Sequence, residues 1–233
     1  MAPSVLIVLT SHSKLGDTGQ PTGWFLPELS HPYNVFAAHN YNITLASPLG
    51  GVAPLDPSSV DFSKDDPSAL EFHRTKSALW ESTRPLSEFA GGRGARDYDA
   101  LFFCGGHGPV FDLATDPTSQ AITAEFAAAG KVVSAVCHGP AALVGVKGEG
   151  GKFLLEGKEV TGFSNEEEEM VGKTEVVPFL LESRIKEIGG KYVKADSAWG
   201  EKVVVDGRLV TGQNPASAKG VGEAVVKLVG EKQ

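Results

Sequence analysis

The sequence predicts an α/β protein with a flavodoxin-like fold, a three-layer α/β/α sandwich around a mostly parallel central sheet. Short runs rich in Val, Ile and Leu alternate with longer helical patterns, and this alternation is typical of a parallel sheet covered on both faces. Right-handed crossovers between such strands produce an open sandwich. With 233 residues and 41% hydrophobic content, the chain is long enough for one well-buried domain spanning 1–233, and no interior linker suggests a second.

The expected strands are short apolar runs, at 5–9, 43–46, 100–104, 132–136, 203–205 and 209–211. The N-terminus lacks the basic start of a signal peptide and is too short to span a bilayer, so it is interpreted as part of the first strand. Asp206-Gly207 separates the last two runs and predicts a tight hairpin. Helical patterns cover 24–39, 117–129, 178–188 and 216–229.

Residues 48–98 interrupt this alternation after the second strand. They are rich in Pro, Ser, Asp and Gly and contain one helical pattern at 69–80. Because long insertions in compact α/β domains are usually functional, we expect a cap over the edge of the site. Decoration of the surface fits the composition equally well.

Composition excludes several classes of function. A net charge of −8 disfavours nucleic acid as a partner. The only two cysteines, Cys104 and Cys137, end separate strand-like runs and cannot form a disulfide framework, which favours reduced thiols in a cytosolic compartment. No grouping of His, Cys and acidic residues has metal-ligand spacing, so we expect no metal site.

The apolar run 132–136 ends at Cys137 and is followed by small residues suited to a helix. A strand, a sharp turn and a helix form the elbow that presents a nucleophile at the carboxyl end of a strand. The N-terminus of the expected helix would favour the thiolate of Cys137. Cys104 also ends a strand but opens no helix, so core packing is the favoured interpretation there.

The turn after the 100–104 strand contains Gly106, His107 and Gly108. Without Cβ atoms, its glycines allow backbone amides to approach a bound carbonyl, and with the amide of His138 they would form an oxyanion hole. A pocket role for His107 and an ordinary structural role are equally supported. Neighbouring residues in a sharp turn tend to point apart, so we do not expect direct proton exchange between Cys137 and His138.

Two sets of carboxylates are candidates for acid–base work. Glu28 lies in an apolar helical pattern; it is either a solvated helix carboxylate or, if it lies beneath the thiol, an acid with a raised pKa. The run Glu166–Glu169 is expected to be mostly solvated, with at most one side chain turned inward.

Several patterns, in order along nearly the whole chain, resemble the ThiJ/PfpI superfamily. They are Glu28 before Ser30-His31-Pro32, then Gly106-His107-Gly108, Cys137-His138-Gly139-Pro140, Thr161-Gly162-Phe163 and Gly212-Gln213-Asn214-Pro215-Ala216-Ser217. The strongest similarity is to the fungal-type glutathione-independent glyoxalases (glyoxalase III), which are also described as heat-shock chaperones.

This resemblance implies a homodimer without a dissociable cofactor that converts a 2-oxoaldehyde such as methylglyoxal to D-lactate. It places the nucleophile on Cys137, the neighbouring histidine on His138 and the nearby acid on Glu28. Counting forward from Thr161-Gly162-Phe163 places the third member of a Cys-His-Glu triad on Glu168. Either His138 or Glu28 is the base that removes the proton from carbon.

Two other classes of function remain open on the sequence. One is a stress-response holdase chaperone or protein deglycase with a redox-sensing thiol, which would bind unfolded client proteins. The other is a Cys-dependent peptidase or amidase. In each case we expect a cytoplasmic protein, or one both cytoplasmic and nuclear, that is not secreted and binds neither nucleic acid nor membrane.

Overall fold

A seven-stranded sheet forms the centre of the computed structural model, which describes residues 2–231. The strand order is β3-β2-β1-β4-β5-β9-β8, and every neighbouring pair is parallel except β8 with β9. The strands are β1 (Ser4–Val8), β2 (Asn42–Ser47), β3 (Arg84–Pro85), β4 (Ala100–Phe103), β5 (Val132–Val136), β8 (Val203–Asp206) and β9 (Leu209–Gly212). A separate parallel pair joins β6 (Glu159–Val160) to β7 (Lys191–Tyr192).

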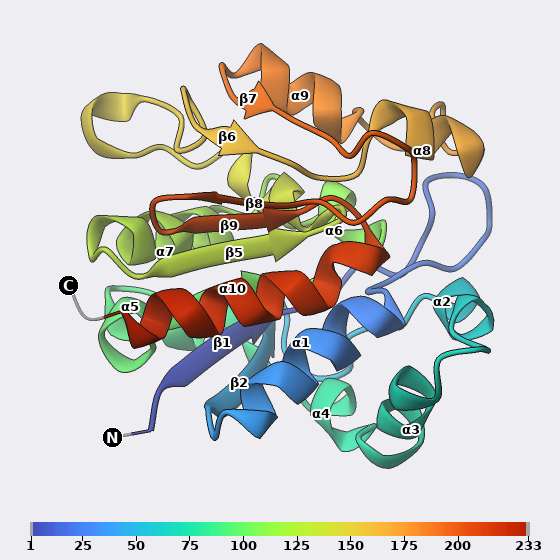
Figure 1. Cartoon of the computed structure of the whole chain (residues 1–233), viewed down its shortest axis with the longest axis horizontal. Helices are drawn as coiled ribbons and strands as arrows, with labels where there is room; N and C mark the ends of the chain where they lie inside the picture. The colour runs from blue at the N-terminus through green and yellow to red at the C-terminus, as the bar shows by residue number, and fades with distance from the viewer. Residues whose placement is uncertain (1, 232–233) are drawn as a thin grey trace.

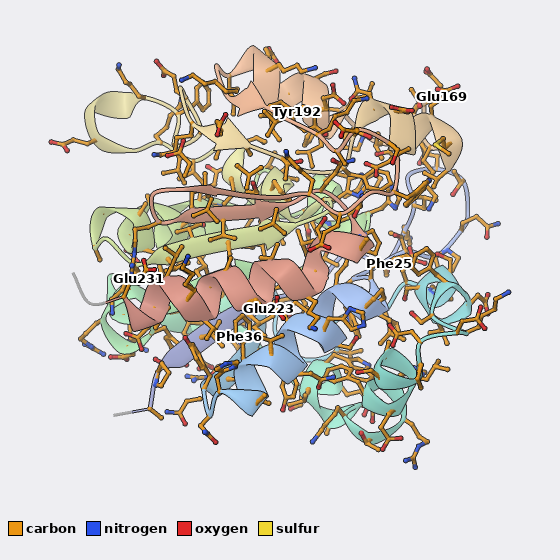
Figure 2. All side chains as sticks on the ribbon, in the orientation of Figure 1. Phe25, Phe36, Glu169, Tyr192, Glu223 and Glu231 are labelled. Atoms are coloured by element: carbon orange, nitrogen blue, oxygen red, sulfur yellow. The ribbon has the colours of Figure 1, made fainter. Side chains whose placement is uncertain are left out.

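Helices cover both faces of the sheet and confirm the expected three-layer sandwich. The helices are α1 (Leu26–Ala38), α2 (Pro57–Phe62), α3 (Pro67–Thr75), α4 (Ala78–Glu81), α5 (Arg93–Asp97), α6 (Gly108–Phe111), α7 (Pro117–Ala128), α8 (Asn165–Met170), α9 (Leu181–Glu187) and α10 (Ala218–Gly230). In Figure 1, α1 and α10 lie in front of the sheet, and α5 and α7 lie behind it. Phe36 is buried on the inner side of α1 (Figure 2). Its ring packs edge to face against Phe102 of β4.

The strand predictions are confirmed within a residue or two. The side chains of β4 and β5 are buried throughout, as expected for parallel strands covered on both faces. The predicted hairpin is present, because β8 and β9 pair antiparallel with Asp206 opposite Leu209. Gly207 adopts a φ of 62° in this turn, a conformation that glycine adopts without steric cost.

Three helix predictions need correction. The single pattern at 69–80 is divided between α3 and α4. The pattern at 178–188 forms a helix only over Leu181–Glu187, because the chain up to Leu180 runs through turns. The segment after Cys137 is not an α-helix but a short 3₁₀ helix, η2 (Gly139–Leu143). It begins with glycine and proline, two residues with low helix propensity, so no long helix dipole points at the thiol.

The insertion 48–98 contributes to the core as well as to the surface. It contains α2 to α5, the edge strand β3 and a 3₁₀ helix, η1 (Leu86–Phe89). Trp80 is buried against Trp24, with ring centroids 5.1 Å apart. No helix within residues 2–231 is long and apolar enough to cross a membrane.

Candidate active site

Cys137 directly follows β5 and has a left-handed backbone conformation, with φ of 60°. Such a φ is strained for a residue with a Cβ and persists only where the surrounding structure holds it. Here the Cys137 amide donates to the carbonyl of Gly212 at 2.9 Å, and the Cys137 carbonyl accepts from the Phe163 amide at 2.8 Å. The elbow predicted from the sequence is therefore present, anchored on both sides.

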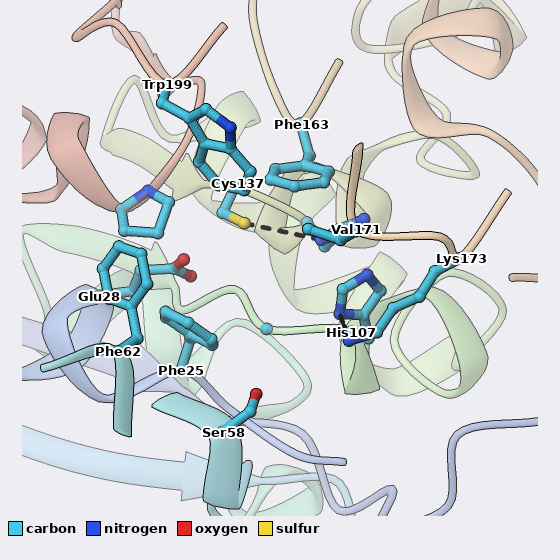
Figure 3. A pocket seen from close by; sticks show the side chains of 13 residues that line it. Phe25, Glu28, Ser58, Phe62, His107, Cys137, Phe163, Val171, Lys173 and Trp199 are labelled. Carbon is cyan, nitrogen blue, oxygen red and sulfur yellow. Dashed lines mark hydrogen bonds between the residues drawn. The ribbon is translucent and has the colours of Figure 1, made fainter. Parts of the chain in front are cut away.

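The Cys137 side chain lines a cavity of about 270 Å³ and is 4% exposed (Figure 3). The cavity wall is mainly apolar. It is formed by Phe25, Glu28, Ser58, Phe62, Gly106, His107, Cys137, His138, Phe163, Val171, Lys173, Trp199 and Pro215. Gly108 does not line this cavity; its amide donates to the carbonyl of Gly23 at 3.3 Å. Ser58 and Phe62 belong to α2, so the insertion supplies part of the wall.

His138 faces the thiol, contrary to the expectation that the two neighbours point apart. Its Nδ1 lies 3.6 Å from the Cys137 Sγ, and its Nε2 lies 2.7 Å from Oε2 of Glu168. Because a carboxylate only accepts hydrogen bonds, Nε2 carries a proton, and in the corresponding neutral tautomer Nδ1 is the acceptor that faces the thiol. The positive φ of Cys137 turns its side chain toward the ring, which reasoning from an ordinary turn missed.

Glu168 bridges two histidines with its two carboxylate oxygens. His107 Nε2 lies 2.8 Å from Oε1, while His138 occupies Oε2. Burial alone would raise the pKa of Glu168, but both histidines hold it well below its ordinary value. Burial and the neighbouring His138 and Lys173 lower the pKa of His107 to about 4, so His107 is neutral at physiological pH. Its Nδ1 then accepts from the Lys173 Nζ at 3.4 Å.

Two of the four glutamates, Glu167 and Glu168, turn inward from the N-terminus of α8, so the expectation of at most one is wrong. Ser164 is the N-cap and forms a reciprocal capping box with Glu167. Glu167 also accepts from the Trp199 amide at 2.9 Å and from Asn214 Nδ2 at 2.8 Å, which makes it a structural residue. The next residue, Glu168, projects to the histidines, whereas Glu166 and Glu169 are exposed.

The C-terminus of α8 places Lys173 beside His107. Gly172 adopts φ of 67°, its amide bonds to the carbonyl of Glu169, and the Lys173 amide bonds to that of Glu168. This pair of bonds is the Schellman motif, which turns the chain back over the end of the helix. Lys173 was not predicted as a site residue, although the glycine after the glutamate run is a signal for this motif.

Glu28 is fully buried in the first turn of α1 and faces the cavity. The Cys137 thiol and the amides of Gly105 and Gly106 surround the carboxyl group, but neither oxygen has a hydrogen bond of good geometry. Burial raises the pKa of Glu28 to about 8. The Glu28 carboxyl group can lie this close to the backbone only because residue 105 is glycine, since a Cβ there would lie 2.3 Å from the Glu28 Oε2.

Burial and the neighbouring Glu28 raise the pKa of the Cys137 thiol well above its ordinary value. The expectation of a thiolate stabilised by a helix N-terminus is therefore wrong for the resting protein, because η2 is short and the thiol is buried. Near neutral pH the resting site holds a thiol and a protonated carboxyl group. Cys104 is buried behind Glu28, with its Sγ 4.0 Å from the Phe25 carbonyl, and does not line the cavity.

The raised pKa of Glu28 makes protein stability depend on pH. Between the unfolded value of 4.5 and the folded value of about 8, the folded state keeps a proton that the unfolded state loses, so stability falls as pH rises. For this group the loss between pH 5 and 8 is roughly 3 to 4 kcal/mol. Urea unfolding of wild type and Glu28→Gln at pH 5 and pH 8 measures this change in the free energy of unfolding. The variant is expected to lose less stability, and parallel pH profiles would contradict the assignment.

Ligand-bearing atoms of His107, His138 and Glu168 all lie within 4.8 Å of one another. The family resemblance placed His138 and Glu168 in one triad, but the sequence did not reveal His107 as a further member, because these residues are about thirty positions apart and only the fold brings them together. Both Nε2 atoms already point at the carboxylate. The geometry is that of a hydrogen-bonded triad, extended by a second histidine.

Comparisons with known proteins identify relatives along nearly the whole chain. Glyoxalase 3 of Candida albicans is 34% identical over 229 residues, which cover 95% of this chain and 96% of that protein. Glutathione-independent glyoxalase HSP31 of Saccharomyces cerevisiae is 33% identical, with 94% of each covered.

Solved structures match equally completely. The crystal structure of glyoxalase III from Candida albicans has a TM-score of 0.86 at 32% identity and covers 97% of both chains. Rapid Encystment Protein 24 KDa of Francisella tularensis has a TM-score of 0.91 at 37% identity, covering 97% of this chain and 99% of that one. A sequence model of the DJ-1/PfpI family matches residues 26–228. The resemblance predicted from the motifs is thus confirmed, and the chain belongs to the DJ-1/PfpI family.

Proposed function

We propose that this protein is a glutathione-independent glyoxalase that converts methylglyoxal to D-lactate through a hemithioacetal on Cys137. The position of the Cys137 sulfur carries this proposal. It lines a largely apolar cavity, with Nδ1 of His138 and the buried acid Glu28 both beside it. The names of the full-length relatives, glyoxalase 3 and glutathione-independent glyoxalase, point to the same reaction.

In the first step, Cys137 Sγ attacks the aldehyde carbon while its proton moves to His138 Nδ1, 3.6 Å away. Glu28, protonated because its pKa is about 8, gives its proton to the aldehyde oxygen. Glu168 stabilises the imidazolium that forms, because its carboxylate accepts a hydrogen bond from the Nε2–H of His138. The Gly106 amide, which contacts the Cys137 sulfur, is a donor for the developing oxyanion.

In the second step, the Glu28 carboxylate removes the proton from the former aldehyde carbon, and His138 protonates the neighbouring oxygen. Glu28 then returns this proton to the former ketone carbon of the enediol. His138 removes the proton from the hydroxyl group on the carbon that is bonded to sulfur. The product is a thioester of the 2-hydroxy acid. One carbon is oxidised and its neighbour reduced, so the electrons balance within the substrate.

In the last step, water attacks the thioester and gives its proton to Glu28, while His138 returns a proton to the departing sulfur. The 2-hydroxy acid leaves, and the thiol and both protonation states are restored. The sulfur of Cys137 takes the role that a soluble thiol would otherwise have.

The test is turnover of methylglyoxal by the purified protein without glutathione, followed by chiral chromatography of lactate. We expect D-lactate in amounts matching the aldehyde consumed. Glu28→Gln cannot exchange protons and is expected to lower kcat by about 10² to 10⁴-fold. Consumption of aldehyde without lactate, or full activity in Glu28→Gln, would contradict the proposal.

The finer assignments rest on the family resemblance. We propose a homodimer in the cytoplasm, a compartment supported by the two free cysteines. A holdase or deglycase acting on client proteins, and a peptidase or amidase, are the competing functions. Protection of an aggregating protein by Cys137→Ser would separate holdase action from the site, and cleavage of peptide amides without aldehyde turnover would favour the peptidase.

A further inference from the structure

Lys173 lies on the wall of the cavity and directs its ammonium group at an uncharged ring. Its Nζ lies 3.4 Å from Nδ1 of His107, and in Figure 3 the lysine side chain ends beside that ring. Among residues 2–231, His107 is the one hydrogen-bond partner of the ammonium group, which forms no ion pair with a carboxylate. The contact of this half-buried cation with a histidine beside the triad points to a role in the reaction.

Glu168 is shared by two histidines, and only one of them exchanges protons in the proposed reaction. His138 becomes an imidazolium when it accepts the thiol proton, and its Nε2 lies 2.7 Å from Oε2 of Glu168. His107 Nε2 lies 2.8 Å from the other oxygen, and the two ring centroids are 4.3 Å apart. Two positive charges this close together in a buried site repel each other. A positive charge on His107 would therefore compete for the charge of Glu168 and oppose protonation of His138.

Lys173 blocks the ring position at which His107 would gain that charge. The Nε2 proton of His107 points at Glu168, so a second proton would have to bind Nδ1. That nitrogen faces the ammonium group, which has three donors and no acceptor. The titratable groups that face the ring come from three other segments: His138 before η2, Glu168 of α8 and Lys173 after α8. Burial, His138 and Lys173 lower the pKa of His107 to about 4, against the opposing effect of Glu168.

We propose that Lys173 is a positioning residue, which donates to Nδ1 of His107 and thereby keeps this histidine in its neutral Nε2–H tautomer. Glu168 then accepts two hydrogen bonds but balances a single positive charge, the one that forms on His138 during attack. The Schellman motif at Gly172 places the backbone of Lys173 for this contact. The kinetic consequence rests on the proposed function, whereas the state of the His107 ring does not.

NMR of the histidine rings tests the proposal independently of activity. Long-range ¹H–¹⁵N correlation distinguishes a protonated from an unprotonated ring nitrogen, and comparison with His107→Asn identifies the signals of His107. Between pH 8 and pH 4.5, wild type is expected to keep Nε2 protonated and Nδ1 largely unprotonated. In Lys173→Met the midpoint for protonation of Nδ1 is expected to rise by about one pH unit, because the cation and the donor are both lost. Lys173→Arg restores both and should return the midpoint towards the wild-type value. An unchanged midpoint in Lys173→Met would overturn the proposal.

The kcat for methylglyoxal measures the consequence for the reaction. In Lys173→Met, kcat is expected to be about threefold below wild type at pH 4.5 and close to wild type at pH 8, because a shift of about one pH unit changes the charge of His107 only at acid pH. The KM should change little. A loss in KM alone, equal at both pH values, would show that Lys173 binds substrate and does not act through His107.

Lys194→Met is the matched control, and thermal unfolding of each variant checks its fold. Lys194 pairs with Glu166 of α8 at 2.7 Å and does not line the cavity, so its loss removes a cation near the same helix without touching the triad. This variant is expected to match wild type in both experiments, and equal effects in the two lysine variants would contradict a specific role for Lys173. Failure of wild type to consume methylglyoxal would contradict the proposed function alone, and the NMR comparison would still decide the role of Lys173.

Discussion

Substituting serine for Cys137 is expected to lower kcat/KM for methylglyoxal by at least roughly 10⁴-fold. A serine hydroxyl is a far weaker acid and a poorer nucleophile than a thiol, so it attacks the aldehyde carbon much more slowly. The protein should still fold, because the anchoring bonds of residue 137 to Gly212 and Phe163 are made by the backbone. The measurement is steady-state lactate formation, accompanied by thermal unfolding of the variant.

Cys104→Ala is the matched control for this experiment. Cys104 is the other thiol, buried behind Glu28 but absent from the cavity wall. We expect near wild-type turnover from this variant. Substantial turnover by Cys137→Ser, or loss of turnover only in Cys104→Ala, would show that the mechanism assigns the wrong sulfur.

Glu168→Gln is expected to lower kcat by about 10³ to 10⁴-fold with little change in KM. The carboxylate accepts from His138 at 2.7 Å and from His107 at 2.8 Å, whereas an amide has one accepting oxygen. One histidine must then face an NH₂ group, which reverses its tautomer or breaks its bond. If His138 reverses, its Nδ1 carries a proton and no longer accepts the one from the thiol.

Glu169→Gln is the control for the adjacent position. Glu169 is exposed and its carboxylate accepts from the Thr174 hydroxyl, so the change should leave both kinetic constants near wild type. Equal losses in the two variants would indicate that charge on α8, and not the bridge between the histidines, supports the reaction.

The strands were predictable because burial on both faces of the sheet requires short, continuous runs of apolar residues. Strands such as β4 and β5, covered on both faces, consist almost entirely of apolar residues. The hairpin before β9 carries its own Asp-Gly signal. The segment after Cys137 was misread, because its small residues fit a helix although Gly139 and Pro140 restrict it to a 3₁₀ turn.

The glutamate run shows how far local rules reach at the site. Ser164 with Glu167 matches the capping-box spacing, which assigns Glu167 to the helix cap and leaves Glu168 to face inward. No local sequence pattern predicts His107 as the second partner of Glu168, because that contact joins segments 61 positions apart. The same holds for Trp199, which reaches the cavity from the loop before β8.

The protonation state of the Cys137 thiol could not be predicted from the sequence either. Its raised pKa depends on complete burial and on Glu28 lying beside it, and both follow from packing between α1 and the turn after β4. A helix dipole was the only influence that the sequence suggested. In the structure, His138 Nδ1 lies 3.6 Å from the sulfur and is placed to accept the thiol proton.

Rapid acid quench of the protein with methylglyoxal, followed by mass spectrometry of its peptides, tests the covalent mechanism most directly. We predict an adduct with the mass of one substrate molecule on the peptide that contains Cys137, formed before lactate appears and lost as lactate accumulates. Steady lactate production with the Cys137 peptide unmodified at every quench time would contradict the mechanism.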